Sequence, residues 1–255
     1  MNIAEHVPEF MYIIGSCLIL PVILFALWAE LKVSRAFNEL SRVGASCDLT
    51  GAEIARKLLD ENGCSHIEVI NIPGHLNDHY DPRKKLVCLS DDVYDSASLA
   101  AIGVAAHEVG HAIQHQQKYL PLLFRQIVIK STSLINKLLM PLIIIGLIAS
   151  LVVTGTYIMG MYSQDFWFFV IIGFCAMYMI SFLVNLITLP TEYNASARAK
   201  KLLDAGGYLH QEEKNAVASV LDAAALTYLA GLLVSLAYML RFLGILFMMF
   251  GDRKK

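Results

Sequence analysis

Charged residues are scarce in this chain of 255 residues. Asp, Glu, Lys and Arg together make up 16% of it, against about a quarter of an ordinary soluble domain. The formal net charge of −2 leaves no basic excess that would bind a phosphate backbone, so we expect no nucleic-acid partner. Because 56% of the residues are hydrophobic, the shortage of charge indicates that much of the chain lies in a lipid bilayer.

The cysteines are few and form no recognisable framework. There are five, an odd number, and no two of them stand in a CxxC pair. We therefore expect neither a disulfide-stapled fold nor a cysteine zinc knuckle. Residues 1–9 contain no Lys or Arg, so the apolar run behind them is not expected to be a cleavable signal peptide.

Long apolar runs are what the sequence does contain, at residues 10–29, 138–160, 166–189 and 223–250. Each is long enough to cross a hydrocarbon core, which takes roughly 20 residues of helix. The sequence thus predicts a mainly α-helical membrane protein with about four transmembrane helices. The last run exceeds the usual length and contains Arg241, so it could form one tilted span or a bent hairpin.

Basic residues indicate the orientation of the chain in the membrane. Lys32, Arg35 and Arg42 follow the first apolar run, and no Lys or Arg precedes it. Positive charge close to a span is retained on the cytoplasmic side. The N-terminus is therefore expected outside the cell, and residues 30–137 inside it.

Residues 30–137 are typical of a small α+β unit at the membrane surface. Thr50 and Glu53 form a capping-box pattern at the start of a helix. Pro190, beyond the third run, is expected to begin another helix. The elements predicted outside the membrane are helices over 49–63 and 96–117, strands over 66–72 and 85–89, and a helix from 190 to about 203.

An HExxH motif starts at His107, on the predicted helix 96–117. Residues four apart project from one helix face, so the imidazoles of His107 and His111 can reach one ion. Zinc favours such ligands and keeps a coordination position open for water, whose proton Glu108 would take as general base. The alternative is that these side chains only cap or solvate a helix. Their apolar neighbours count against it, because buried His and Glu require partners.

A zinc site of this kind needs a third protein ligand, and Glu192 is the candidate. Two predicted spans separate it from His107, so the chain has returned to the same side of the membrane. Ala195 and Ala199 share its helix face, and their small side chains would let this helix approach the metal helix at Gly110. The alternative is a glutamate that only caps the first turn of its helix.

Three stretches of the chain resemble the bacterial YugP-type neutral zinc metallopeptidases. They are residues 78–83 (DHYDPR), 105–114 (AAHEVGHAIQ) and 189–196 (LPTEYNAS). The resemblance implies a gluzincin-like site, similar to that of the HtpX group of membrane proteases, with Zn²⁺ as cofactor and Glu192 as third ligand. This chain has Asn194 where the family pattern leads us to expect Asp, which replaces an acidic partner behind the ligands by a neutral one.

The expected protein is thus a zincin-like endopeptidase of the bacterial plasma membrane. Its active site would face the cytoplasm, and its substrates would be membrane or membrane-proximal proteins. The expected segments are an N-terminal transmembrane anchor (1–29), a catalytic segment (30–137), a two-helix transmembrane hairpin (138–189), the helix with the third ligand (190–216) and a C-terminal membrane segment with a basic tail (217–255).

Two other functions remain open on the sequence. In a site-2-type intramembrane protease the third ligand is an aspartate, and Asp204 could take that place. The polar residues on either side of the helix 96–117 count against it, because they leave too short an apolar stretch to span a bilayer. The other possibility is a catalytically inactive membrane scaffold or transporter, in which Glu108 would have no role as a base.

Further polar residues surround the predicted site. His79 or Tyr80 could donate a hydrogen bond to the oxyanion of a tetrahedral intermediate, although Asp81-Pro82 also suits a plain tight turn. His115, one turn beyond the motif, is expected at the helix end or behind the ligands. It follows His111 too closely to be the third histidine of the longer metzincin motif.

Overall fold

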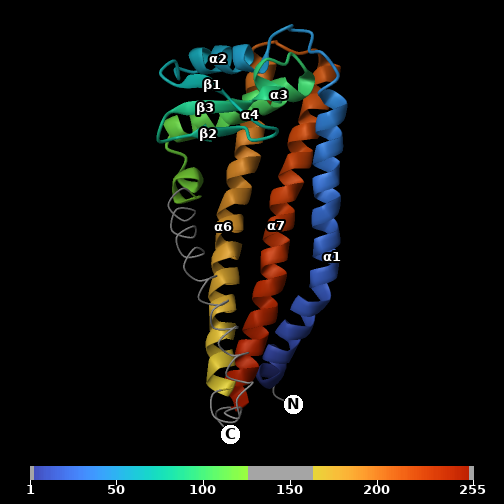
Figure 1. Ribbon diagram of the computed structural model, residues 1–255, viewed down its shortest axis with the longest axis vertical. Helices are drawn as coiled ribbons and strands as arrows, with labels where there is room; N and C mark the ends of the chain where they lie inside the picture. The colour runs from blue at the N-terminus through green and yellow to red at the C-terminus, as the bar shows by residue number, and fades with distance from the viewer. Residues whose placement is uncertain (1–2, 126–162, 253–255) are drawn as a thin grey trace. The chain divides into compact units, whose positions relative to one another are not determined.

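The computed structural model describes residues 3–125 and 163–252, and these residues are mainly helical (Figure 1). The helices are α1 (Ile3–Leu40), α2 (Gly51–Glu61), α3 (Asp91–Tyr94), α4 (Leu99–Gln116), α6 (Ser163–Ala205) and α7 (Gln211–Asp252). The strands are β1 (Glu68–Ile72), β2 (His79–Asp81) and β3 (Leu86–Ser90).

Three of the described helices are long and apolar enough to cross a membrane, over His6–Leu40, Ile171–Ala205 and Gln211–Phe250. They contain three of the four predicted apolar runs, and the run 138–160 lies outside the described residues. The run 223–250 belongs to one continuous helix, α7, which excludes the bent hairpin.

Helix α6 does not begin after Pro190 as predicted, and this part of the prediction is wrong. It runs without a break from Ser163 to Ala205, with Pro190 inside it. A proline removes one backbone hydrogen bond, a loss that membrane helices tolerate where neighbouring side chains supply other bonds. The next residue, Thr191, adds a hydroxyl bond to the Ile187 carbonyl at 3.0 Å, one carbonyl beyond that of Leu186, whose usual donor Pro190 lacks. One helix therefore carries both the third apolar run and Glu192.

The chain divides into two compact units. The first consists of Met1–Ala26, Arg125–Leu186 and Ala230–Lys255, and the second of Leu27–Phe124 and Ile187–Leu229. Within the first unit, α1 and α7 approach closely at two glycines. A Cβ atom on Gly15 would lie 2.5 Å from the Arg241 backbone nitrogen, and one on Gly244 would lie 2.5 Å from the Tyr12 nitrogen. Such backbone contact at small residues is how helices associate in lipid.

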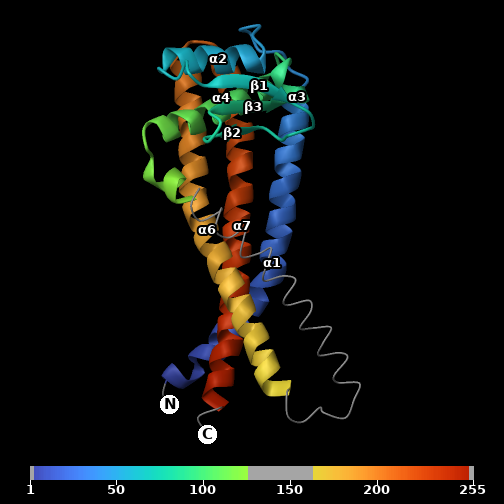
Figure 2. The same cartoon turned by 60° about the vertical axis from the view of Figure 1, so that its left-hand side comes forward.

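The second unit, called the sheet unit below, contains a three-stranded sheet of order β1-β3-β2 (Figure 2). Strand β3 is central, parallel to β1 and antiparallel to β2, and Val87 pairs with Val69 on one side and Tyr80 on the other. The predictions for β1 and β3 are confirmed. Strand β2 has only three residues within a loop rich in His and Asp, and the sequence pattern did not reveal it.

Helices α2 and α4 bury the sheet and each other in one apolar core. The capping box of α2 forms as predicted, since Thr50 N donates to Glu53 Oε2 at 2.9 Å and Glu53 N to Thr50 Oγ1 at 3.2 Å. The core residues include Leu58 of α2, Leu89 of β3 and Ile102 of α4, none of which is exposed to solvent. This core fixes α4, the helix that carries the HExxH motif.

Candidate metal centre

The two histidines of the motif lie on successive turns of α4, with their rings close together. The Ser98 hydroxyl caps this helix by accepting from Ala101 N at 3.2 Å, and an alanine-rich sequence continues it to Gln116. The rings of His107 and His111 lie edge to face, with their centroids 4.8 Å apart and their planes at 89°. The four-residue spacing thus places both imidazoles on one face, as predicted.

Helix α6 brings Glu192 to this pair. Its Oε2 atom lies 3.2 Å from His107 Nε2 and 3.3 Å from His111 Nε2. Glu192 is 1% exposed, and the potential ligand atoms of the three residues all lie within 4.8 Å of one another. Among the described residues, this is the group of His, Cys, Asp and Glu side chains that could hold a metal ion.

Small residues allow the two helices to come this close. A Cβ atom on Gly110 would lie 2.7 Å from the Ala195 carbonyl oxygen, so only glycine fits at this point of α4. Ala195 and Ala199 are fully buried. The predicted approach of the two helices is therefore confirmed at Gly110.

Gly110→Ala should separate α4 from α6 at the metal site. We expect a cost of about 1–3 kcal/mol, typical of overpacking, together with weaker zinc binding. Thermal unfolding in detergent and zinc content would measure both effects. Gly44→Ala is the matched control, because a Cβ atom there meets nothing within 4 Å and should change neither quantity. Equal behaviour of the two variants would mean that the contact at Ala195 is readily relieved.

The outer nitrogens of both histidines are hydrogen-bonded. His107 Nδ1 lies 3.1 Å from Ser196 Oγ, and His111 Nδ1 lies 3.0 Å from Gln114 Oε1. The amide nitrogen of Gln114 donates to the Thr191 carbonyl at 2.8 Å, so its oxygen faces His111 and accepts from the ring. With Nδ1 engaged by Gln114, Nε2 is the His111 nitrogen that faces the carboxylate of Glu192. A metal ion between these two atoms would accept a lone pair from each.

The donor set fits zinc in its chemistry, and the two separations that involve Glu192 fit zinc in length. Two imidazole nitrogens and one carboxylate oxygen are a common zinc ligand set. Tetrahedral ligands with bonds of roughly 2.0–2.1 Å lie about 3.3–3.4 Å from one another. The separations of 3.2 and 3.3 Å between the histidine nitrogens and Glu192 Oε2 match this value.

A chain of hydrogen bonds extends from the ligands into the space between α4 and α6. Gln114 Nε2 also donates to Asn194 Oδ1 at 2.9 Å, and Arg198 Nε donates to the same oxygen at 2.7 Å. Arg198 in turn donates to Gln117 Oε1 at 2.7 Å. Asn194 therefore lies behind the ligands and accepts from both neighbours, a role that a neutral amide can perform.

Gln114 and Ser196 were not identified from the sequence as part of the site. Both are polar residues within otherwise small or apolar helix faces, Gln114 at 0% exposed and Ser196 at 5%. Their spacing from the candidate ligands was the signal in the sequence that could have identified them. Gln114 follows His111 by three residues and Ser196 follows Glu192 by four, so each shares a helix face with a ligand.

Gln114→Ala should lower zinc affinity by about 10–100-fold, because the partner that orients His111 is lost. Titration of zinc against a competing chelator would measure the change. Gln116→Ala provides the matched control on the same helix, since Gln116 is exposed and its amide donates to the Gly63 carbonyl at 3.1 Å. The same zinc affinity in both variants would contradict a positioning role for Gln114.

Glu108 is buried beside the candidate metal ligands. Burial is the main cause that raises its pKa to about 7, and the carboxylates of Glu192 and Asp78 act in the same direction. His107 and His79 oppose this shift. A cation at the centre would also lower the pKa. A carboxyl group in this range can both accept and release a proton near neutral pH.

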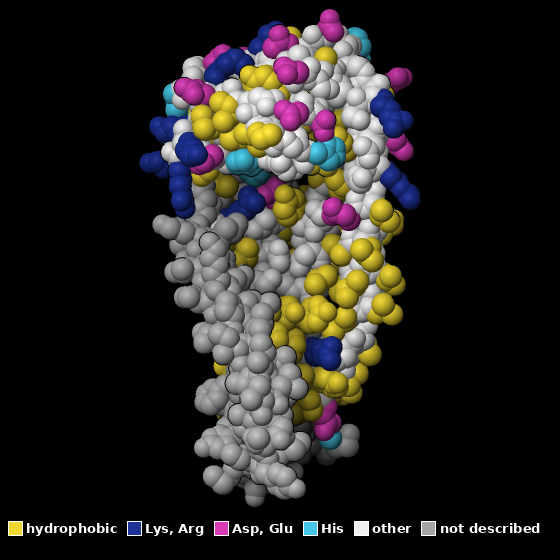
Figure 3. Space-filling model, viewed as in Figure 1, with side chains coloured by type: hydrophobic (Ala, Val, Ile, Leu, Met, Phe, Trp, Pro, Cys, Tyr) yellow, Lys and Arg dark blue, Asp and Glu magenta, His cyan; other side chains and the backbone are white. Residues whose placement is uncertain are grey.

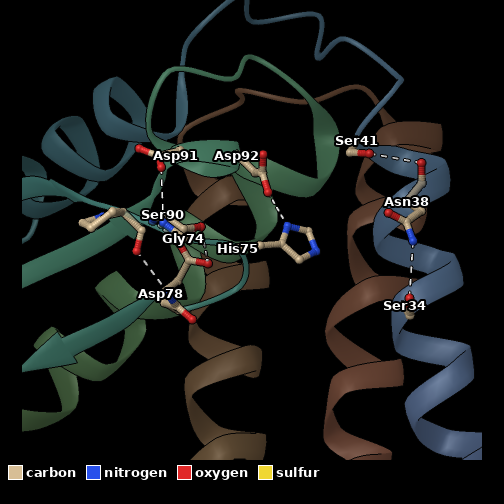
Figure 4. Close-up of polar contacts among 11 residues, drawn as sticks. Ser34, Asn38, Ser41, Gly74, His75, Asp78, Ser90, Asp91 and Asp92 are labelled. Atoms are coloured by element: carbon tan, nitrogen blue, oxygen red, sulfur yellow. Dashed lines mark hydrogen bonds and ion pairs between the residues drawn. The ribbon is translucent and has the colours of Figure 1, made fainter.

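The polar loop before β3 contributes a separate network. Asp78 accepts from the Ser90 backbone N at 2.8 Å and from its hydroxyl at 3.0 Å, which ties the loop to the end of β3 (Figure 4). In the same view, His75 of the loop points to Asp92 and Gly74 N lies 3.2 Å from Asp91 Oδ2. These bonds fix the segment that leads into β2.

His79 and Tyr80 occupy different environments in β2. His79 Nδ1 donates to the Asn77 carbonyl at 2.8 Å, and the ring is close enough to Glu108 to influence its pKa. The Tyr80 hydroxyl lies 2.9 Å from His115 Nδ1, and burial raises the pKa of this tyrosine to about 12. His115 thus contacts the sheet from the end of α4. Of the two candidates for an oxyanion donor, His79 is the one that influences the pKa of Glu108.

Asp204 lies far from the histidine pair. It is 69% exposed and forms an ion pair with Lys214. It follows Glu192 by 12 residues on the continuous helix α6, which separates the two by about 18 Å along the axis. The site-2-type arrangement, with Asp204 as third ligand, is therefore not found.

Comparison with known proteins supports a zinc peptidase. Residues 15–247 match the model of a family described as "Putative neutral zinc metallopeptidase". The chain is also 42% identical over 217 residues to a protein of Bacillus subtilis described as "Putative membrane protease YugP". That alignment covers 84% of this chain and 88% of the relative. No solved structure matches the chain.

Proposed function

Because this chain belongs to the zinc metallopeptidase family whose model it matches, we propose that it is a membrane-bound endopeptidase with His107, His111 and Glu192 as ligands. The observation that carries the proposal is the convergence of their three donor atoms in a buried site. Glu192 comes from a helix 85 residues further along the chain than His107, and the spacing of its oxygen from both histidines suits tetrahedral coordination.

Zinc held at this centre would lower the pKa of a coordinated water and polarise a peptide carbonyl. Glu108 then serves as general base, which takes the proton from the attacking water and returns it to the leaving amine. Gln114 and Ser196 keep the two imidazoles in orientation through their outer nitrogens. His79 would stabilise the oxyanion that develops at the carbonyl oxygen.

Peptidase activity that depends on zinc is the direct test of this function. The purified full-length protein in detergent should cleave an unfolded protein substrate. Removal of zinc with a chelator should abolish cleavage, and added zinc should restore it. A protein that binds zinc stoichiometrically but cleaves no substrate, whatever the conditions of the assay, would indicate a membrane scaffold instead.

We also propose that the catalytic segments face the cytoplasm. Lys118 and Arg125 precede the central membrane segments, and Arg198, Lys200 and Lys201 follow them. These basic flanks favour retention on the inner side. Zinc ligation adds a stricter condition, namely that both flanks lie on the same side of the membrane. Ligands from both segments must reach one ion at roughly 2.0–2.2 Å, which a bilayer between them would prevent.

Single cysteines at positions 117, 163 and 201 would test this orientation, in a background without the five native cysteines. A membrane-impermeant thiol reagent applied to intact cells should label position 163 alone. Permeabilised cells should show labelling at all three positions, which controls for accessibility. If one of positions 117 and 201 is labelled in intact cells and the other is not, both the orientation and the assignment of Glu192 are wrong.

A further inference from the structure

A groove of about 450 Å³ lies between α1 and α7 in the sheet unit, outside the candidate metal centre. Its lining residues are chiefly Trp28, Leu31, Lys32, Arg35 and Glu39 of α1 and Ser219 of α7. We refer to it as the α1–α7 groove. Each of these α1 residues has another three or four positions away, so together they form a single stripe along the helix.

The groove lies where the apolar runs of both helices end. On α1 the apolar run reaches residue 29, and on α7 the apolar run begins at residue 223, four residues after Ser219. Each helix rises about 1.5 Å per residue, so the end of the apolar run on α1 and the start of the run on α7 both lie within about 6 Å of the groove. Two helices that come from different parts of the chain thus place the groove at the level of the lipid headgroups.

The end of the groove nearest the apolar run of α1 suits the boundary between hydrocarbon and headgroup. Trp28 is 49% exposed and Leu31 is 56% exposed. Tryptophan is enriched at this depth of the membrane, where its ring contacts both apolar and polar surroundings. The Lys32 ammonium lies 5.0 Å from the centroid of the Trp28 ring, one turn further from the apolar run. Figure 3 shows dark blue basic side chains beside yellow apolar ones along the α1 side of the molecule.

The charge in the groove favours an anion. Two cations, Lys32 and Arg35, line it together with one carboxylate, that of Glu39. Among the residues that the structure describes, no ion pair joins either cation to a carboxylate. A phosphate group between Lys32 and Arg35 would supply an anionic partner, while acyl chains would extend over Leu31 and the exposed Leu27.

We propose that the α1–α7 groove is a binding site for an anionic glycerophospholipid. Its phosphate is bound by Lys32 and Arg35, and its glycerol region packs on Trp28. Basic pockets between membrane helices on the cytoplasmic side bind anionic headgroups in this way. The proposal does not depend on peptidase activity, and its test uses binding alone.

Fluorescence of Trp28 provides the test. The chain has two tryptophans, and Trp167→Phe leaves Trp28 as the only emitter. The full-length variant would be reconstituted in phosphatidylcholine vesicles with a small fraction of either brominated phosphatidylglycerol or brominated phosphatidylcholine, which quench tryptophan on contact. We expect brominated phosphatidylglycerol to bind at Trp28 with a preference on the order of fivefold, the effect of one lipid-surface cation.

Lys32→Gln with Arg35→Gln should abolish this preference, whereas Arg42→Gln, a basic residue of the same region that does not line the groove, should retain it. Circular dichroism and zinc content would verify that each variant is folded. Equal quenching by both lipids in the parent protein would overturn the proposal. Displacement of the brominated lipid by an excess of inorganic phosphate would also overturn it, because the site would then recognise free phosphate rather than a lipid.

Discussion

Glu108→Gln is expected to reduce the turnover of a peptide substrate by on the order of 10³-fold, within the range for loss of a general base. The amide has nearly the shape of the carboxyl group but cannot accept the proton of the attacking water. Glu108 is not one of the three converging ligands, so zinc content should remain that of the parent protein. Steady-state cleavage of a fluorogenic peptide and metal analysis of the purified variant would measure the two quantities.

The pH profile makes this prediction more specific. Because Glu108 must be ionised to act as a base, activity of the parent protein should rise with pH as this group loses its proton. Its pKa of about 7 sets the upper limit for this rise, since bound zinc lowers the pKa. The residual activity of Glu108→Gln should lack this acid limb. Full activity in the variant, or an unchanged acid limb, would remove Glu108 from the role of base.

Loss of the metal is the second large effect, expected for His107→Ala, His111→Ala and Glu192→Ala. Each change removes one of the three converging donors. Loss of a residue that only orients a ligand costs about 10–100-fold in affinity, so loss of a ligand should cost more than about 100-fold. Zinc analysis after dialysis against a weak chelator should find these variants nearly empty.

His115→Ala and Asp204→Ala are the controls for that experiment. His115 lies on the same helix as both histidine ligands, but its ring contacts Tyr80. Asp204 lies on the same helix as Glu192, but it pairs with Lys214. Both variants should retain zinc. Loss of zinc from Asp204→Ala together with full occupancy in Glu192→Ala would reverse the assignment of the third ligand.

The sequence by itself determined the parts of the protein that depend on short spacing along the chain. Apolar runs predicted the long helices, and Thr50 with Glu53 predicted the start of α2. The HExxH spacing predicted that His107 and His111 share one helix face. Such features follow from a helical repeat of 3.6 residues and from contacts within one or two turns, so they can be predicted without the rest of the fold.

The third ligand could be predicted only in part. Topology, small neighbouring residues and the resemblance to a family all favoured Glu192, but none of them gave its position relative to the histidines. Its placement depends on the close contact of α4 and α6 at Gly110 and on the continuity of α6 through Pro190. The sequence pattern had indicated a new helix there, because proline usually ends the preceding one.

Only the tertiary structure decided how the metal site is supported. Gln114 contacts His111 on its own helix and Thr191 and Asn194 on another, 77 and 80 residues away. Strand β2 exists because β3 offers it a partner, and its three residues are too few to form a pattern of their own. Contacts between distant segments depend on how several elements pack around one core, and this information is absent from any single window of the sequence.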